Sequence, residues 1–555
     1  NTIKKNLKKL IISKNWRIIN MVQNNQQPLI VLADGSTRTS GSQATKNNIM
    51  AAKLLSNVLK TTLGPRGMDK MLINSIGDVK ITNDGYTVLK ETEPDHPAAK
   101  MIVDLAKMQE EEYGDGTTTA VVLVGEILKE AEKLIEQGIP TSTIVKGFEE
   151  SKNKTLEVLD EIAIPAQEEE LINVARTSMS GKGSFTNLDK MAKELVEALL
   201  NVEEDGQIDQ DMIKIRKIHG EGTEDTEISE CVTVDKNVLE SEMPKDVKDA
   251  KIALLQYPMD ARELQNDAKI KLTTPGEYQA YLDKEAQMLQ DEVQKLVDAG
   301  VTVLFNNKKI SDLCQHYLTK AGILTAKRVK AGDLERLSKA TGANIVNDIK
   351  ELTSDDLGEA GHVYEREVFE DREYIFIEDC KYAGVLNIII RGSTKHITDQ
   401  LEQAINDAIG AVIKTRQDDK ALPGGGAADI AASKALRKYA NKFTDKEQLV
   451  IKAYADALEQ LPVALAKNAG MDTIDVLTKL LAKQNESTNM GVNVIKRDVS
   501  DMKADKILDS QNSKKAIVES ATEIAGEILR IDDVVSTKPM TPVGGDMPGT
   551  PNPYM

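Results

Sequence analysis

The run Gly114-Asp115-Gly116-Thr117-Thr118-Thr119 is the part of this sequence best suited to chemistry. Its two glycines allow positive φ and a close approach of the backbone to a ligand. Hydroxyls and exposed amides at a helix start suit phosphate oxygens, and Asp115 tolerates a phosphate when a divalent cation such as Mg²⁺ lies between them. Asp and Thr at a helix start are also typical of an N-cap without any ligand. The Walker A pattern GxxxxGK[ST] does not occur, so a phosphate site here is not a P-loop.

Three further glycine clusters offer close approach of the backbone: Gly64-Pro65-Arg66-Gly67, Asn83-Asp84-Gly85 and Gly424-Gly425-Gly426. Each alone is typical of an ordinary turn, so a nucleotide site requires several of them to converge. A helix expected over 396–414 carries Asp399, Glu402 and Asp407, a pattern usually found on a solvated face. A carboxylate from a neighbouring domain can instead orient an attacking water. The residues by themselves indicate a candidate magnesium–nucleotide hydrolase without a P-loop.

Composition bounds the class of protein that must position these residues. The chain has 555 residues, and its 71 basic and 89 acidic side chains give a net charge of −18. This length predicts about three to four domains, and an acidic chain is a poor match for general nucleic-acid binding. No apolar run is long enough to span a membrane. Three cysteines without CxxC spacing exclude a zinc ribbon and favour the reducing cytoplasm.

Periodicity divides the chain into helical ends and an α/β centre. It predicts helices over 45–60, 98–112, 120–136, 141–164, 276–298, 396–414 and most of 427–533. It predicts strands over 79–82, 252–255, 301–305, 345–346, 374–377 and 385–390. The order is helical, mixed, α/β, mixed and helical, which indicates nested domains with the outer one built from both chain ends. From the sequence alone, the apolar stripe of 276–298 is more typical of core packing than of any other role.

The two ends of the chain are not expected to belong to the folded domains. Residues 1–20 carry six basic and no acidic side chains, and we interpret them as a disordered extension upstream of Met21. Residues 536–555 are rich in Pro, Gly and Met, which predicts a flexible tail.

Together these segments resemble the group II chaperonins, and among them the archaeal thermosome group. The resemblance rests on five segments: Thr61–Lys70, Asn83-Asp84-Gly85, Gly114–Thr119, Asn468-Ala469-Gly470-Met471-Asp472 and Ile528-Leu529-Arg530-Ile531-Asp532-Asp533. Gly35-Ser36-Thr37-Arg38 and the tail agree with it. It extends over about residues 28–535, in order and without large gaps, so it is far more specific than any single motif.

The resemblance implies a multidomain α and β subunit. An equatorial ATPase domain is expected over 21–166 and 424–535, a small mixed intermediate domain over 167–235 and 386–423, and an apical α/β domain over 236–385. A helical lid protrusion is expected near 270–300 of the apical domain.

The resemblance also assigns roles, residue by residue. Asp115 is expected to hold magnesium, Asp407 to orient the hydrolytic water with Asp84 close by, and Lys182 to sense the γ-phosphate. The remaining expected nucleotide contacts are Leu63, Gly64, Pro65, Gly116, Thr117, Thr118, Thr119, Gly425, Gly491 and Asp509. Lys506 and Ser510 stand where glycine and proline are typical of the family, which weakens the ribose contact expected of Asp509.

The implied activity is ATP hydrolysis with ATP and Mg²⁺, coupled to lid closure around non-native proteins. The implied partners are identical or homologous subunits in a double ring and unfolded proteins, with no nucleic acid and no membrane. Two other readings stay open: a ring-forming holdase that needs no turnover, and a monomeric small-molecule kinase or ATPase. The sequence shows no histidine-based acid–base constellation for the latter.

Overall fold

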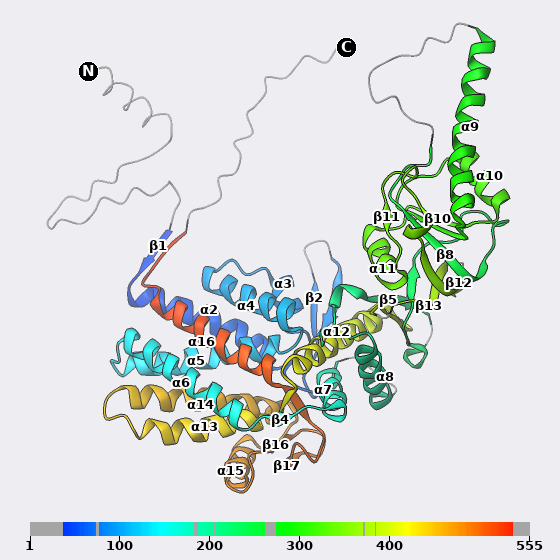
Figure 1. Cartoon of the computed structure of the whole chain (residues 1–555). Helices are drawn as coiled ribbons and strands as arrows, with labels where there is room; N and C mark the ends of the chain where they lie inside the picture. Colours follow the sequence, from blue (N-terminus) through cyan, green and yellow to red (C-terminus); the bar gives the residue numbers. More distant parts are fainter. Residues whose placement is uncertain are drawn as a thin grey trace, which may run out of the picture.

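The computed structural model describes residues 37–73, 77–182, 187–203, 206–220, 222–260, 274–369, 372–382 and 384–536 (Figure 1). The extension expected over 1–20, the motif residues Gly35 and Ser36, and the tail beyond residue 536 lie outside this range. Within it the chain folds into several mixed α and β units, each with its own hydrophobic core.

The first unit is helical and is formed by both ends of the chain (Figure 1). Its helices are α2 (Ser42–Lys60), α3 (Gly85–Thr92), α4 (Pro97–Tyr113), α5 (Thr117–Glu136), α6 (Thr141–Glu161), α13 (Ala427–Ala440), α14 (Glu447–Asn468), α15 (Thr473–Lys483) and α16 (Gln511–Arg530). Its strands are β1 (Thr37–Ser40), β2 (Lys70–Ile73), β3 (Val79–Thr82), β16 (Met490–Asn493), β17 (Asp498–Asp501), β18 (Leu508–Ser510) and β19 (Asp533–Ser536). Every residue of α5 from Ala120 to Leu128 is buried, as expected of a central helix with apolar residues on all sides.

The second unit is small and combines helices with a three-stranded sheet, ordered β5-β14-β6. Its elements are β4 (Ile164–Pro165), α7 (Glu168–Met179), α8 (Leu188–Asn201), β5 (Ile213–His219), β6 (Glu227–Ser229), β14 (Leu386–Gly392), α12 (Lys395–Asp418) and β15 (Lys420–Pro423). Strand β5 is parallel to β14, and β6 is antiparallel to it. Helix α12 runs from this unit towards the helical unit (Figure 1).

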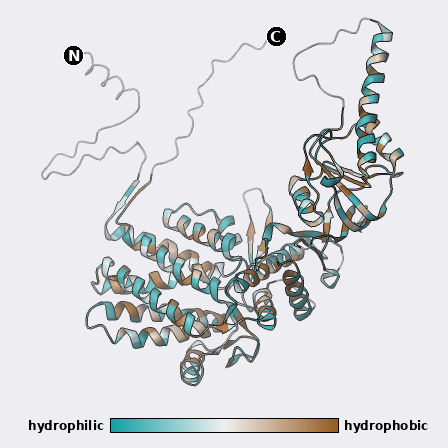
Figure 2. Ribbon diagram, in the orientation of Figure 1, coloured by the Kyte–Doolittle hydropathy of each residue, from teal (hydrophilic) through white to brown (hydrophobic). Residues whose placement is uncertain are grey.

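The third unit is an α/β layer around a seven-stranded sheet of order β10-β9-β8-β12-β13-β7, with β11 paired to β8. Its elements are β7 (Val232–Val234), β8 (Asp246–Leu255), α9 (Pro275–Ala299), β9 (Val303–Asn306), α10 (Asp312–Ala321), β10 (Leu324–Lys327), α11 (Ala331–Thr341), β11 (Ile345–Val346), β12 (Gly358–Phe369) and β13 (Arg372–Cys380). The middle of this sheet is largely hydrophobic and is buried, including all of β9 and residues 252–255 of β8 (Figure 2), because both faces of the sheet are covered there.

Helix α9 projects from the third unit and has two different halves (Figure 1). In its C-terminal half Leu289, Val293 and Leu296 are buried. In its N-terminal half Tyr278 is 55% exposed and Leu282 is 38% exposed. The predicted stripe is therefore core at one end of the helix and exposed surface at the other.

Four local predictions differ from the structure. The helix expected over 141–164 ends at Glu161, and Ile164-Pro165 pair with β15 instead. The helix expected from residue 120 begins at Thr117, so the hydroxyl run forms its first turn. Three short strands, β16, β17 and β18, interrupt the helical region after residue 427. The turn expected at Asn83-Asp84-Gly85 is shorter than predicted, because Gly85 is already the first residue of α3.

Candidate functional site

A cavity of about 810 Å³ lies where the first and second units meet. It is lined by the loop after α2, the starts of α3, α5 and α13, the end of α7, and the strands β16 and β18 with the loops beside them. All the residues expected to bind nucleotide or metal line this cavity except Gly491. A Cβ added at Gly491 would lie 2.6 Å from Met502 Cγ. The three glycine clusters therefore do converge, which the sequence could not establish.

The start of α5 faces the cavity without a side-chain cap. Its N-cap residue is Gly116, with φ 84°, in the left-handed conformation that favours glycine. A Cβ on Gly116 would lie 2.6 Å from Ile517 Cδ1, so the Ile517 side chain would have to shift to admit it. The first turn is Thr117-Thr118-Thr119, and its amides carry the positive end of the helix dipole. Such a terminus is suited to an anion.

The start of α13 repeats this arrangement in the same cavity. Its N-cap is Gly426, with φ 75°, again without a side-chain cap. A Cβ there would lie 2.6 Å from Cβ of Pro462 inside α14. By contrast, the side chain of Asp84 caps α3 and that of Ser510 caps α16. Two glycine-started helices thus direct N-termini without side-chain caps, and their positive dipole ends, at one space.

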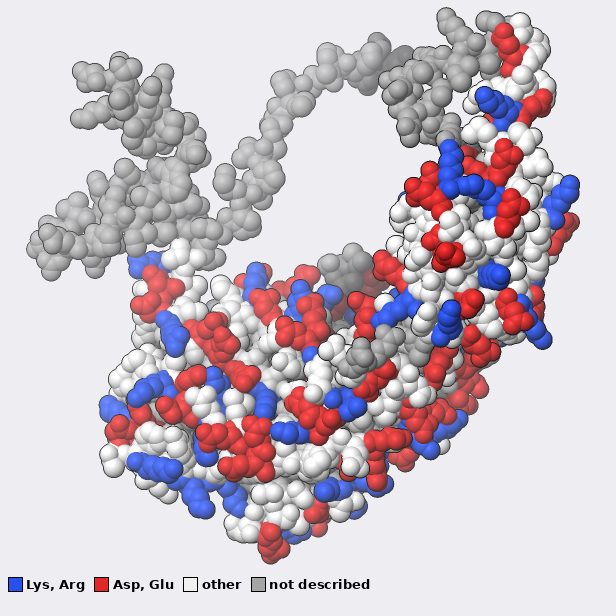
Figure 3. Space-filling view, in the orientation of Figure 1, with Lys and Arg blue, Asp and Glu red and all other residues white. Residues whose placement is uncertain are grey.

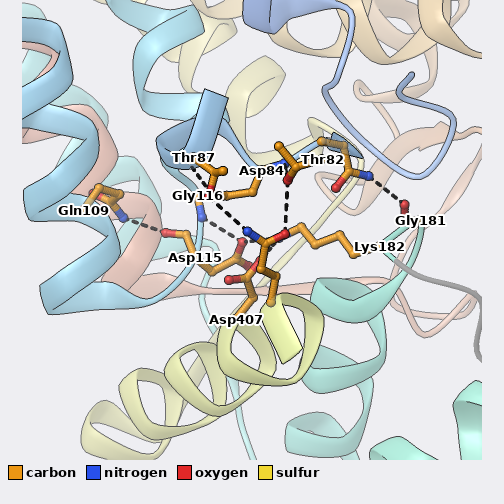
Figure 4. Close-up of polar contacts among 11 residues, drawn as sticks. Thr82, Asp84, Thr87, Gln109, Asp115, Gly116, Gly181, Lys182 and Asp407 are labelled. Carbon is orange, nitrogen blue, oxygen red and sulfur yellow. Dashed lines mark hydrogen bonds and ion pairs between the residues drawn. The ribbon is translucent and has the colours of Figure 1, made fainter. Parts of the chain in front are cut away.

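Hydrogen bonds fix the two aspartates beside the first of these helices (Figure 4). Asp84 Oδ2 accepts the backbone N–H of Thr87 at 2.7 Å. Asp115 Oδ1 accepts the N–H of Gly116 at 2.7 Å, and the buried Gln109 donates to the Asp115 carbonyl at 2.8 Å. Both carboxylates are therefore held in fixed positions beside the hydroxyl run.

Lys182 and Asp407 complete the cluster from the second unit (Figure 4). Lys182 Nζ lies 3.2 Å from Asp115 Oδ1 and also forms an ion pair with Asp407 Oδ2. Burial raises the pKa of Asp407 to about 7, and the charges of Asp115 and Asp84 add to this, although Lys182 opposes it. Burial lowers the pKa of Lys182, but the carboxylates outweigh it and raise that pKa overall. Asp407 is only 3% exposed, and it does not itself line the cavity.

Sequence reasoning missed Glu110 on α4. Burial raises the pKa of Glu110 to about 9, with contributions from the charges of Asp407 and Asp84. Its place one helical turn before Gly114 was a usable signal, because residues four apart share a helix face. It adds a further carboxyl group beside those of Asp84, Asp115 and Asp407.

An ion pair on the opposite side of the cavity was also not predicted from the sequence. Lys514 on α16 lies 2.8 Å from Asp429 on α13, and both are buried. Asp429 follows the Gly424-Gly425-Gly426 cluster by one turn, so its place in the cavity wall could have been inferred once that cluster was assigned to a site.

Asp509 lines the cavity from β18, and burial raises its pKa to about 6. The two unusual residues beside it have clear local roles. Lys506 adopts φ 59°, a conformation that favours glycine. Ser510 accepts a hydrogen bond from the N–H of Ser513 and so caps α16. Neither change removes the Asp509 carboxyl from the cavity.

The donors suit magnesium only in part. Among the described residues, no three Asp, Glu, His or Cys side chains are placed to hold a metal ion together. Mg²⁺ is, however, usually bound through one or two carboxylates with the phosphates of a nucleotide supplying other ligands. Asp115, with Asp84 and the Thr117–Thr119 hydroxyls nearby in the cavity wall, fits that second mode.

On the face drawn in Figure 3, basic and acidic side chains are interspersed. No helix in the described part of the chain is long and apolar enough to cross a membrane.

Comparison with known proteins places these features in a family. The model of the TCP-1/cpn60 chaperonin family matches residues 55–539. Thermosome subunits beta and alpha of Methanothermobacter thermautotrophicus are 48% and 46% identical to this chain, each match covering 92% of it and 95% of the relative. A thermosome subunit of Methanocaldococcus jannaschii is 43% identical, covering 94% of this chain and 98% of the relative. The chain belongs to the TCP-1/cpn60 chaperonin family.

Proposed function

We propose that this member of the TCP-1/cpn60 chaperonin family is an ATP-dependent molecular chaperone. The observation that carries the proposal is the pair of glycine-started helices, α5 and α13, whose uncapped N-termini face one cavity beside Asp115, Lys182 and Asp407. A polyphosphate needs this combination of amide donors, a lysine and a cation-binding carboxylate.

In this proposal the nucleotide lies in the cavity with its phosphates at the start of α5. Thr117, Thr118 and Thr119 bind the phosphates together with Gly116. Leu63, Gly64 and Pro65 cover the nucleotide from the loop after α2, and Gly425 lies at the start of α13. Asp509 is the candidate for the ribose. Gly491 lies behind the cavity wall and supports it indirectly, because the absence of a side chain leaves room for Met502 and the Gly424 carbonyl.

Asp407 is the proposed catalytic residue, with Asp84 beside it. A base that accepts a proton from water works best with a pKa near the working pH, and burial gives Asp407 a pKa of about 7. Lys182 would bind the terminal phosphate while it holds Asp407 in place. Magnesium held by Asp115 would neutralise charge on the phosphates.

The nested domain order is part of the same proposal. The expected equatorial domain corresponds to the helical core formed by both chain ends, the intermediate domain to the core around α7, α8 and α12, and the apical domain to the α/β unit. Because Asp407 and the phosphate site belong to different cores, movement of the second unit would couple hydrolysis to closure of the helix α9 over a cavity in the assembled ring.

A holdase without turnover is the second candidate, and the exposed half of α9 favours it. Tyr278, Tyr281, Leu282 and Met288 are all exposed there. Apolar side chains on a projecting helix can bind unfolded chains whether or not ATP is hydrolysed. The complete carboxylate cluster around Lys182 favours the ATP-driven machine, because passive binding does not require it.

The test is ATP turnover by the purified chain in magnesium buffer, with native mass measured by light scattering. We expect turnover, its loss in Asp115→Ala, and a double ring of identical or homologous subunits. Turnover retained in full by Asp115→Ala would contradict the magnesium assignment. Absence of turnover, together with suppression of aggregation of an unfolded protein, would support the holdase, and an active monomer would support the small-molecule ATPase.

A further inference from the structure

One face of α12 contacts the site loops along most of the length of the helix. The contacting positions are spaced by three and four residues, as positions on one helix face are. In order they pair Gln400 with Asp69, Gln403 with Thr82 and Thr87, Asp407 with Lys182, Gly410 with Gly114, and Lys414 with the ring of Tyr113. Asp407 lies at the centre of this row, between Gln403 on one side and Gly410 on the other.

Gln403 makes the most specific of these contacts. Thr82 Oγ1 donates to Gln403 Oε1 at 3.1 Å, and Gln403 Nε2 donates to Thr87 Oγ1 at 3.0 Å. The two hydroxyls flank Asp84 on either side. The Asp84 N–H donates to Thr82 Oγ1 at 3.1 Å, and Asp84 Oδ2 accepts the Thr87 N–H at 2.7 Å. One amide of α12 therefore closes a ring of hydrogen bonds around the Asp84 turn.

One turn beyond Asp407, a backbone contact between α12 and the end of α4 sets the closest approach of the two units. Gly410 lies directly on Gly114: a Cβ on Gly410 would be 2.7 Å from Gly114 Cα and 2.8 Å from the carbonyl oxygen of Tyr113. Only glycine permits this approach. Gln403 and Gly410 thus hold α12 against the helical unit, one on each side of Asp407.

We propose that Gln403 is a positioning residue for ATP hydrolysis. Through its bridge to Thr82 and Thr87 it sets the distance of Asp407 from the phosphate site. This inference rests on the proposed function, because it assumes that Asp407 acts on a bound nucleotide. The physical reason is that the apolar neighbours of Asp407, Ile405 and Ala408, pack in a different hydrophobic core from Ala120 at the start of α5, so packing within one core does not fix the separation of Asp407 from the phosphate site. Hydrogen bonds that cross between the units do.

The test compares two glutamines of the same helix in the full chain. Gln403→Met keeps the length of the side chain but removes both hydrogen bonds. Gln400→Met is the matched control, since Gln400 makes only an exposed contact of 3.3 Å with Asp69. We expect Gln403→Met to lower kcat about tenfold, the size of effect that two such hydrogen bonds allow, with ATP affinity changed less than twofold. Gln400→Met should change neither quantity. Equal kcat in the two variants would overturn the proposal.

A second background separates positioning from general loss of structure. In Asp407→Asn, Gln403→Met should cause no further fall in kcat, because the group that it positions is already inactive. A tenfold fall in that background as well would overturn the proposal.

Thr87→Val tests the same bridge from the other unit, if Gln403→Met does not fold. It removes the hydroxyl that accepts from Gln403, whereas Thr87→Ser keeps it. We expect Thr87→Val to reproduce the loss of kcat and Thr87→Ser to retain at least half of the original rate. Equal rates for the Val and Ser variants would overturn the proposal.

Hydrogen exchange provides a readout that does not need turnover. Peptides covering residues 82–92 should exchange at least threefold faster in Gln403→Met than in Gln400→Met, because the Thr87 N–H lies in the bridged turn. Unchanged exchange would overturn the bridge. A wild-type chain without turnover but with this change in exchange would contradict the proposed function and leave the bridge supported.

Discussion

Two helices that start at the cavity, α5 and α13, and two helices of the α/β unit, α9 and α10, begin in opposite ways. Helices α5 and α13 start at glycines with positive φ and no side-chain cap. Helix α9 starts at Thr274, which accepts the N–H of Glu277, and α10 starts at Ser311, which accepts the N–H of Cys314. The first pair leaves amides open towards a cavity, whereas the second pair satisfies them with side chains.

The cavity and α9 also differ in the side chains that they expose. The cavity wall combines the charged and hydroxyl groups near the start of α5 with apolar residues such as Leu465 and Val492, whereas α9 presents Tyr278 and Leu282 to the surface. The groups available for binding therefore differ: backbone amides at the cavity and apolar side chains on α9. Open amides suit a phosphate, and open apolar surface suits another apolar surface. Changes made to one region should leave the other's binding intact.

The largest effect is expected at Asp407. Asp407→Asn keeps the shape of the side chain but removes the base, so we expect ATP turnover to fall by about a hundredfold or more. Capture of an unfolded protein by α9 should remain. Turnover is measured by phosphate release and capture by suppression of aggregation. A variant with turnover within a factor of three of the wild type would rule out Asp407 as the base.

The next effect concerns the open start of α5. Gly116→Ala places a Cβ 2.6 Å from Ile517 Cδ1 at φ 84°, and we expect ATP affinity to fall by about thirtyfold, from backbone strain and a displaced helix end. Gly322→Ala is the matched control: it has φ 73° at the end of α10, and its Cβ would meet nothing within 4 Å. Calorimetry with ATP measures both. Equal affinity in the two variants would show that the open helix start does not bind the nucleotide.

The pH dependence of turnover tests the electrostatics of the cluster. Asp407 must be ionised to act as a base, and its pKa is raised to about 7 by burial. As pH falls below about 7, kcat/KM for ATP should therefore fall about tenfold for each pH unit. Above that pH this group no longer limits the rate. Asp407→Asn should lack this limb of the profile, and a wild-type profile that is flat between pH 5.5 and 7.5 would contradict the assignment.

The smallest effect is expected on α9. Replacing Tyr278 and Leu282 together by Ser removes exposed apolar surface, so we expect about a fivefold weaker capture of an unfolded protein, with ATP turnover unchanged. Leu313→Ser on α10 is a suitable control because Leu313 is also exposed, at 40%. Should the double variant capture substrate as well as the control does, the exposed half of α9 is not the binding surface.

The sequence predicted local features well and long-range ones only through resemblance. The helix over 276–298 and the strand over 79–82 were found to within two residues of their ends. The strand Ile164-Pro165 was missed, since it pairs with a segment more than 250 positions away. The start of α5 was placed three residues late, because threonine is a weak helix former, whereas the left-handed conformation of Gly116 lets the helix begin at Thr117.

The candidate site shows the same division between local features, which the sequence predicts, and long-range contacts, which it does not. The sequence by itself determined which segments carry glycine, hydroxyl and carboxylate groups, because these follow from residue type and from backbone conformations that only glycine adopts readily. Only the tertiary structure decided that Asp407 is buried with a raised pKa and that Gln403 spans the Asp84 turn. The partners of Gln403 are 321 and 316 positions away along the chain. Burial and charge proximity act through space, and helical or strand periodicity contains no information on which distant residue will supply them.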